Sequence, residues 1–208
     1  DSFYRHFHYA FGNSLKNSNV LLEDKLKHSA EYVEALYQNW YLKELTGCWT
    51  NAISENLSSL GYVSEIGKQH DFYPRYVRPL AGKNSRAFVI ISDALRYEVA
   101  AELCDTIIRT TKGTAKLDAV QSIFPSITKF GMANLLPGRK LSVTEDMEVL
   151  VDGQHSRSTP EREKILCSGN PNSVAVQYTD VLNMKRADRR ELVSGKEVVY
   201  IYHNTIDA

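Results

Sequence analysis

Apolar residues in the N-terminal part of the chain recur with the period of an amphipathic helix. Between residues 20 and 45 they stand every three to five positions, which predicts one long helix. Gly47 is expected to end this helix, because glycine readily adopts the left-handed conformation found after many helix ends. Residues 49–60 predict a second, shorter helix that ends at Gly61.

The hydrophobic pattern changes character near residue 84. Residues 72–84 contain prolines and a glycine without a sustained period, so they predict a connecting loop. We therefore expect a domain boundary there, with a helical region and linker over residues 1–84 and a second domain over residues 85–208.

Beyond this boundary, short apolar runs alternate with helical periods. Strands are predicted at residues 86–91, 117–124, 147–151, 173–178 and 197–202. Helices are predicted at residues 95–109, 128–136 and 181–193. Strands that alternate with helices imply an α/β fold with a mostly parallel sheet and helices on both faces. The sequence thus predicts a helical segment followed by an α/β domain.

Composition and charge narrow the functional classes. Hydrophobic residues make up 43% of the chain and charged residues 24%, values typical of a globular protein with a real core. Lys plus Arg and Asp plus Glu both total 25, so no net charge attracts a polyanion such as DNA. The longest apolar runs are far shorter than a membrane-spanning helix. The widely spaced Cys48, Cys104 and Cys167 indicate buried thiols in a reducing, cytoplasmic setting rather than a disulfide framework.

Both ends of the chain suggest a longer protein. The first residue is Asp1 rather than Met, and Ala208 comes soon after an apolar, strand-like run. We expect further ligands for a metal site beyond residue 208, and we expect these 208 residues to be close to inactive by themselves.

Residues able to bind a metal follow three of the predicted strands. Asp93, Thr128 and His203 each stand shortly after a strand, and Asp207 follows His203 by one helical turn. In an open parallel sheet, ligands bind outside the carboxyl ends of the strands. We therefore expect these four residues to converge at one edge of the sheet and to bind a metal ion. Taken singly, each has an ordinary explanation: Asp93 and Thr128 as helix caps, and His203 as a half-buried histidine.

Three segments resemble the motifs of a known family. They are VIISDALRYE at residues 89–98, IFPSITKFGMANLLPG at residues 123–138, and YIYHNTID at residues 200–207. In this order they resemble the PglZ domain, a member of the alkaline phosphatase superfamily found in BREX phage-resistance systems. The resemblance covers residues 86–208 and implies the first half of an alkaline phosphatase-like core. Many members of the superfamily have Asp-Gly where this chain has Asp93 and Ala94.

The resemblance implies a metal-dependent phosphatase or phosphodiesterase. Thr128 matches the nucleophile, which a metal bound by Asp93 would activate. A second ion would have His203 and Asp207 as ligands, and the mixed nitrogen and oxygen donors favour zinc, with manganese as the alternative. Arg96 is a candidate for binding the substrate phosphate, although an exposed helix arginine is the more frequent explanation. The partners implied are a phosphate ester and the other components of a phage-defence complex.

Two other functional classes remain open. The domain could act as a scaffold that keeps a metal site for structure. The cluster Lys185, Arg186, Arg189 and Arg190 could contact nucleic acid, although such a run is more often the solvated face of a helix.

Overall fold

The chain folds into two compact units, of which the second contains the sheet. The computed structural model describes residues 4–7, 9–10, 20–82 and 84–206. The units are Asp1–Ser64 and Glu65–Ala208, so their division precedes the boundary expected near residue 84. The loop expected over residues 72–84 is partly helical, with a π-helix, η3, at Tyr73–Val77. Both end residues of η3 are buried in the core of the second unit.

The first unit contains a long, uninterrupted helical run. It comprises α2 (Val20–Leu36), the π-helix η1 (Tyr37–Leu42) and α3 (Lys43–Leu60). The prediction that Gly47 ends a helix is wrong, because Gly47 lies inside α3. A glycine inside a helix costs only about 1 kcal/mol, which the turns on either side can offset. Gly61 does end the run: its φ is 74° and its N–H donates to the Leu57 carbonyl at 3.1 Å.

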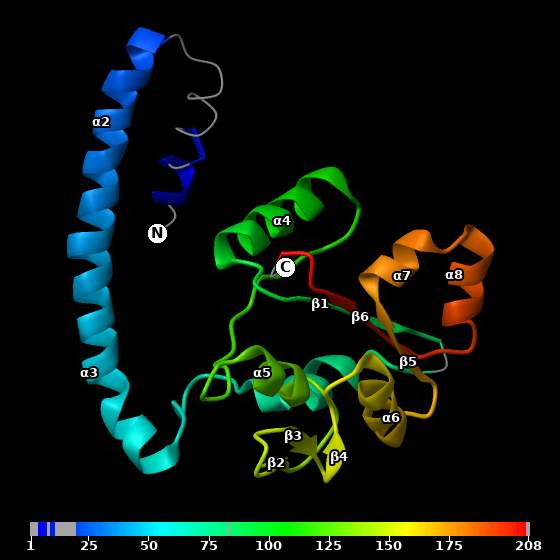
Figure 1. Cartoon of the computed structure of the whole chain (residues 1–208). Coiled ribbons are helices and arrows are strands. Elements are labelled where there is room, and N and C mark those ends of the chain that lie inside the picture. The colour runs from blue at the N-terminus through cyan, green and yellow to red at the C-terminus, as the bar shows by residue number, and fades with distance from the viewer. Residues whose placement is uncertain (1–3, 8, 11–19, 83, 207–208) are drawn as a thin grey trace. The chain divides into compact units, whose positions relative to one another are not determined.

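A parallel sheet organises the second unit (Figure 1). Its strands are β1 (Ala87–Ser92), β5 (Ser173–Gln177) and β6 (Val198–His203). Among the described residues the order is β1-β6-β5, and both pairings are parallel. The predictions of strands at residues 86–91, 173–178 and 197–202 are confirmed. The α/β fold is therefore present, preceded by a helical region.

Helices flank this sheet and differ in part from the sequence prediction. They are α4 (Tyr97–Thr110), α5 (Thr128–Asn134), α6 (Thr159–Gly169), α7 (Tyr178–Asn183) and α8 (Arg186–Val193). The single helix predicted over residues 181–193 is two helices, because Met184 and Lys185 are extended between them. Helix α6 was not predicted. It begins with a capping box, in which the Ser158 side chain accepts from the Glu161 N–H and Glu161 accepts from the Ser158 N–H.

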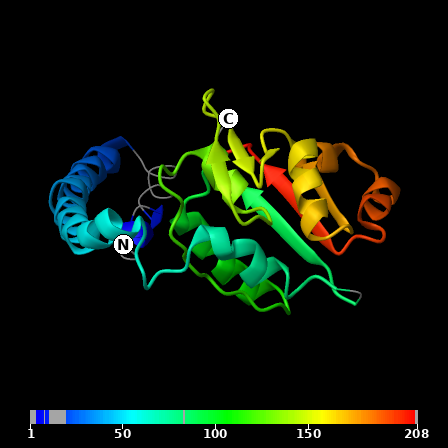
Figure 2. The ribbon, with the colours of Figure 1, turned by 90° about the horizontal axis from the view of Figure 1, so that it is seen from below.

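The core lies on the face of the sheet that packs against α5 and α6 (Figures 1 and 2). Tyr200 and Tyr202 stand two residues apart in β6, so their side chains lie on the same face of the strand, and both are buried in this core. Leu166 of α6 is completely buried there. On the opposite face, Phe88 and Ile90 of β1 are 55% and 67% exposed.

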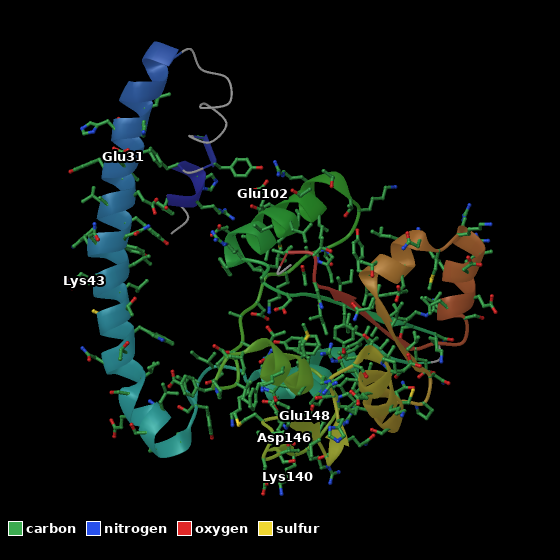
Figure 3. The ribbon with its side chains drawn as sticks, in the orientation of Figure 1. Glu31, Lys43, Glu102, Lys140, Asp146 and Glu148 are labelled. Carbon is green, nitrogen blue, oxygen red and sulfur yellow. The ribbon has the colours of Figure 1, made fainter. Side chains whose placement is uncertain are left out.

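Two segments predicted as strands behave differently. The prediction of a strand at residues 117–124 is wrong: the segment forms only an isolated parallel bridge between Gln121 and Lys68. Residues 149–151 do form a strand, β3 (Val149–Val151), but it belongs to a separate antiparallel sheet with β2 (Leu141–Val143) and β4 (Gln154–His155). Figure 3 shows Lys140, Asp146 and Glu148 gathered at this small sheet.

The outer edge of β5 is partly occupied by a side chain. The Glu163 carboxylate, from α6, accepts a hydrogen bond from the backbone N–H of Ala175 at 2.9 Å. Nearby, the Gln177 amide donates to the Thr159 hydroxyl at 2.6 Å. Side chains of α6 thus satisfy groups along the β5 edge.

Among the described helices, none has the length and apolar character required to cross a bilayer.

Candidate functional site

Asp93 is delivered by the parallel sheet. It directly follows β1, and its backbone N–H donates to the His203 carbonyl at 3.0 Å, which extends the β1–β6 pairing by one bond. Its side chain is half-buried, and Oδ1 accepts from the N–H of Ala94 at 3.1 Å. The sheet therefore fixes the backbone that carries this carboxylate.

Thr128 is the first residue of α5 and is exposed. Three residues of the helix that follows, Phe130, Met132 and Ala133, are buried in the core. The Ile127 carbonyl accepts from the N–H groups of Phe130 and Gly131, both at 3.0 Å. Because α5 is anchored by its buried face, the hydroxyl at its first residue is held on a fixed support.

Asp93 and Thr128 line one open cavity of about 280 Å³. The other lining residues are Gln69, Ile91, Ser92, Ser122, Ser126, Ile127, Gly131, Met132 and Leu135. A carboxylate, hydroxyl oxygens and a carboxamide thus face a common space. These are oxygen donors that suit a hard divalent cation and polar groups that suit a phosphoryl group.

His203 ends β6 at the same edge of the sheet, but it is not one of those lining residues. Its Nδ1 lies 2.8 Å from the Ser92 hydroxyl oxygen, and its ring meets the Tyr178 ring edge-on with centroids 4.7 Å apart. Because Tyr202 points into the core, His203 points to the opposite face. Asp207, the remaining predicted ligand, lies outside the described residues.

Arg96 is placed away from the cavity. Its side chain is 79% exposed and lies 3.6 Å from the Glu98 carboxylate. It occupies the position before α4, where it does not line the space between Asp93 and Thr128. The structure brings Asp93 and Thr128 together and leaves Arg96 in solvent.

The described residues contain an incomplete set of donors for a metal ion. Within residues 4–7, 9–10, 20–82 and 84–206, no three His, Cys, Asp or Glu side chains are grouped closely enough to hold an ion. Asp93 and Thr128 carry oxygen donors that line the same cavity. His203 Nδ1 contacts the Ser92 hydroxyl, so Nε2 is the ring nitrogen that a metal ion would use.

Sequence reasoning missed the polar residues that share the cavity with Asp93 and Thr128. Ser122 and Ser126 belong to the run that leads to Thr128, and hydroxyls spaced so closely before Thr128 were an available signal. Ser92 adjoins Asp93 and could have been identified in the same way. Gln69 could not, because its contacts depend on a long-range bridge.

The basic cluster near α8 is partly used within the fold. Arg189 donates from Nε to the Val181 carbonyl at 3.0 Å and from Nη2 to the Leu182 carbonyl at 3.1 Å. It therefore caps the C-terminal end of α7. Arg186 and Arg190 are exposed, next to the carboxylates of the same helix, which is the pattern of a solvated surface.

Ala94, next to Asp93, has a left-handed backbone with φ of 60°. This conformation costs a residue with a Cβ roughly 1 to 2 kcal/mol, whereas glycine adopts it freely. Ala94→Gly should therefore raise the free energy of unfolding by up to about 1 kcal/mol, after the greater flexibility of glycine in the unfolded chain is subtracted. Urea unfolding followed by circular dichroism measures the change.

Ala187→Gly is the matched control, since Ala187 is exposed in the regular helix α8. That substitution should lower the free energy of unfolding by about 0.5 to 1 kcal/mol. If both variants were destabilised equally, the strain at Ala94 would be disproved.

Comparison with known proteins identifies the family of this chain. Residues 72–208 match the family described as the BREX system PglZ alkaline phosphatase-like domain. The chain is 39% identical to the alkaline phosphatase-like protein PglZ of Bacillus cereus over its full length, which covers 24% of that relative. It is 40% identical to the alkaline phosphatase-like protein BrxZ of Escherichia coli over 88% of the chain and 22% of that relative.

The chain thus spans about a quarter of the length of these curated relatives. No solved structure matches it. The family match covers more than half of the chain and includes β1, α5 and β6, the elements that carry Asp93, Thr128 and His203. The chain therefore belongs to the family of BREX system PglZ alkaline phosphatase-like domains.

Proposed function

We propose that this domain is part of a metal-dependent hydrolase of phosphoric esters in which Thr128 is the nucleophile. The observation that carries the proposal is the shared cavity of Thr128 and Asp93, lined further by serine hydroxyls. A nucleophile beside a carboxylate that can hold a cation is the arrangement that phosphoryl transfer requires.

In this proposal the reaction proceeds in two displacements at phosphorus. The Thr128 oxygen attacks the phosphorus atom, its proton is lost, and the alcohol oxygen of the ester leaves with the bonding electron pair and gains a proton. Water then attacks the phosphothreonine, which releases phosphate and restores the hydroxyl. Ser122 and Ser126 line the cavity as donors for the phosphoryl oxygens.

Divalent ions, zinc in the first place and manganese as the alternative, suit the donors available. Asp93 and Thr128 would hold one ion, and His203 through Nε2 with Asp207 would hold a second. Bound ions would lower the pKa of the threonine hydroxyl and neutralise charge on the phosphoryl group. Because a threonine hydroxyl is a weak nucleophile when unassisted, the reaction depends on this activation.

The biological setting follows from the relatives. The family description places such domains in BREX systems, and we infer that the longer protein acts within a phage-defence complex with other components of that system. Its natural substrate is a phosphate ester. Arg96 would reach such a substrate only if its exposed side chain, now beside Glu98, turned toward the cavity.

A scaffold without catalysis is the second candidate. It is favoured by the donor set, since the described residues contain no group of three or more ligating side chains. In that case the Asp93 and Thr128 cavity would serve an interaction within the defence complex rather than turnover.

We expect the complete protein to hydrolyse an aryl phosphate ester only when metal is bound. The assay uses p-nitrophenyl phosphate and bis-p-nitrophenyl phosphate, with elemental analysis of the same sample. Removal of the ions by a chelator should abolish product release, because the Thr128 hydroxyl then lacks activation. Addition of zinc or manganese should restore it.

Comparison of the two substrates separates phosphatase from phosphodiesterase activity. Metal bound stoichiometrically without hydrolysis of either ester would favour the scaffold. Hydrolysis that survived complete removal of the ions would contradict the metal-dependent mechanism.

A further inference from the structure

The segment just before the matched family domain forms part of the candidate site. The family match begins at residue 72, whereas the second compact unit begins at Glu65. Within this short stretch, the Gly67 carbonyl accepts from the Gln121 N–H at 2.8 Å, and the Gln69 N–H donates to the Gln121 carbonyl at 2.9 Å. These two bonds tie the stretch to the chain that leads to Thr128.

Side chains of the same stretch reach the helix that follows Thr128. His70 Nδ1 lies 3.0 Å from the Asn134 side-chain oxygen, and Asn134 is only 4% exposed at the end of α5. The Gln69 carboxamide donates to the Gly131 carbonyl at 3.5 Å. The stretch is therefore hydrogen-bonded both to the chain that leads to Thr128 and to α5, the helix that Thr128 begins.

The Gln69 side chain contacts both the chain before Thr128 and helix α5. Its Oε1 accepts from the Ile123 N–H at 3.4 Å, while its Nε2 donates to the Gly131 carbonyl, and its carboxamide lines the cavity with Asp93 and Thr128. Both bonds are long, so neither adds much to stability. Their effect is geometric, because Ile123 and Gly131 flank Thr128 on either side in the chain.

We propose that Gln69 is a positioning residue for Thr128. It holds the loop before Thr128 and the first turn of α5 at a fixed separation, so that the hydroxyl faces the space shared with Asp93. Its catalytic consequence rests on the proposed function, since a positioned nucleophile matters only where Thr128 attacks a substrate. A displacement of the nucleophile by about 1 Å can cost on the order of 100-fold in rate.

Gln69→Met tests the proposal in the complete protein, because methionine keeps the length of glutamine and removes both hydrogen bonds. We expect amide hydrogen exchange in peptides covering residues 121–131 to accelerate by about two- to fivefold, as the Ile123 N–H loses its acceptor. With an aryl phosphate ester, kcat should fall by about 10- to 100-fold, while KM changes less than about threefold.

Gln154→Met is the matched control, because Gln154 is exposed in β4 and does not line the cavity. It should leave exchange in residues 121–131, kcat and KM unchanged. Gln69→Glu is the second variant. It keeps an acceptor for the Ile123 N–H but places a carboxylate against the Gly131 carbonyl oxygen. Amides in the first turn of α5 should therefore exchange faster than those around Ile123.

The two readouts separate this proposal from the proposed function. Exchange in residues 121–131 that is the same in Gln69→Met, Gln69→Glu and the unsubstituted protein would overturn the positioning role, whatever the turnover. Faster exchange there, in a protein that hydrolyses no phosphate ester with metal bound, would refute the proposed function and keep the role of Gln69 in holding the loop. The positioning role would also be overturned if Gln69→Met lowered kcat and the free energy of unfolding without changing exchange in residues 121–131.

Discussion

Thr128→Ala in the complete protein should lower kcat for an aryl phosphate ester by at least about a thousandfold. In the proposed reaction the substitution removes the oxygen that attacks phosphorus, and the serine hydroxyls of the cavity lie outside α5. The fold should remain intact, because Thr128 is exposed and the buried face of α5 anchors the helix through Phe130 and Met132. Steady-state kinetics with metal bound measures the loss, and circular dichroism checks the fold.

Thr128→Ser is the control for this substitution, since it keeps the hydroxyl and deletes one methyl group. It should retain a measurable fraction of the turnover. Metal content should be affected little by either substitution if the acidic ligands hold most of the affinity. Unchanged release of product by Thr128→Ala would show that another group attacks the phosphorus.

Tyr200→Phe and Tyr202→Phe should change stability in opposite directions, although both tyrosines are fully buried neighbours on β6. The Tyr200 hydroxyl donates to the Leu135 carbonyl at 2.8 Å, so its removal should cost roughly 1 to 3 kcal/mol of unfolding free energy. The Tyr202 hydroxyl makes no hydrogen bond of ordinary geometry among the described residues, although the Arg162 guanidinium lies 4.7 Å from the centroid of its ring. Its removal should therefore leave the protein no less stable, with a gain of up to about 1 kcal/mol.

Urea unfolding at neutral pH, followed by far-ultraviolet circular dichroism, tests this pair of variants. Tryptophan fluorescence would not serve, because Trp40 and Trp49 both belong to the first compact unit. Tyr97→Phe is the matched control, since Tyr97 is 64% exposed and its substitution should be nearly neutral. A loss for Tyr202→Phe as large as that for Tyr200→Phe would contradict the assignment of the hydrogen bond.

The alkaline range sharpens the same comparison. Burial raises the pKa of Tyr202 to about 12 from an ordinary value of 10.0, although the charge of Arg162 and a weak contact of its guanidinium with the hydroxyl oppose the rise. The folded state thus favours the neutral hydroxyl, and its contribution is fully present below about pH 10 and is lost as the pH rises through 12. Tyr202→Phe removes this loss, so its advantage over the unsubstituted protein should grow between those pH values.

Local sequence pattern was sufficient for the strands of the parallel sheet. The runs at residues 86–91 and 197–202 are apolar and β-branched, and both become buried, paired strands. Residues 117–124 are apolar apart from Asp118, Gln121 and Ser122, but there the chain meets only Lys68 in an isolated bridge. Whether an apolar run becomes a strand depends on a neighbour distant in the sequence, and no local pattern specifies that neighbour.

Helix α6 shows the opposite failure. Its interior is polar apart from Ile165 and Leu166, so the hydrophobic period is weak, and the helix escaped prediction. Its start was nevertheless readable, because Ser158 and Glu161 have the spacing of a capping box with Pro160 between them. End signals would have identified this helix where periodicity did not.

The candidate site was predictable where a residue follows a strand or a motif directly. Asp93 and Thr128 stand at such positions and share a cavity. Gln69 does not, because it reaches that cavity only through the pairing of its backbone with Gln121. Arg96 shows that a suitable residue type close to a ligand in sequence can still point into solvent.

The Glu163 carboxylate makes the two edges of the parallel sheet unequal. Because the Glu163 carboxylate accepts from the Ala175 N–H, this N–H at the β5 edge is not available to pair with an additional strand. The β1 margin lies at the other end of the order β1-β6-β5, beside the exposed Phe88 and Ile90. Asp93 directly follows β1, so a strand added at that end of the sheet would lie beside the strand that leads to this carboxylate.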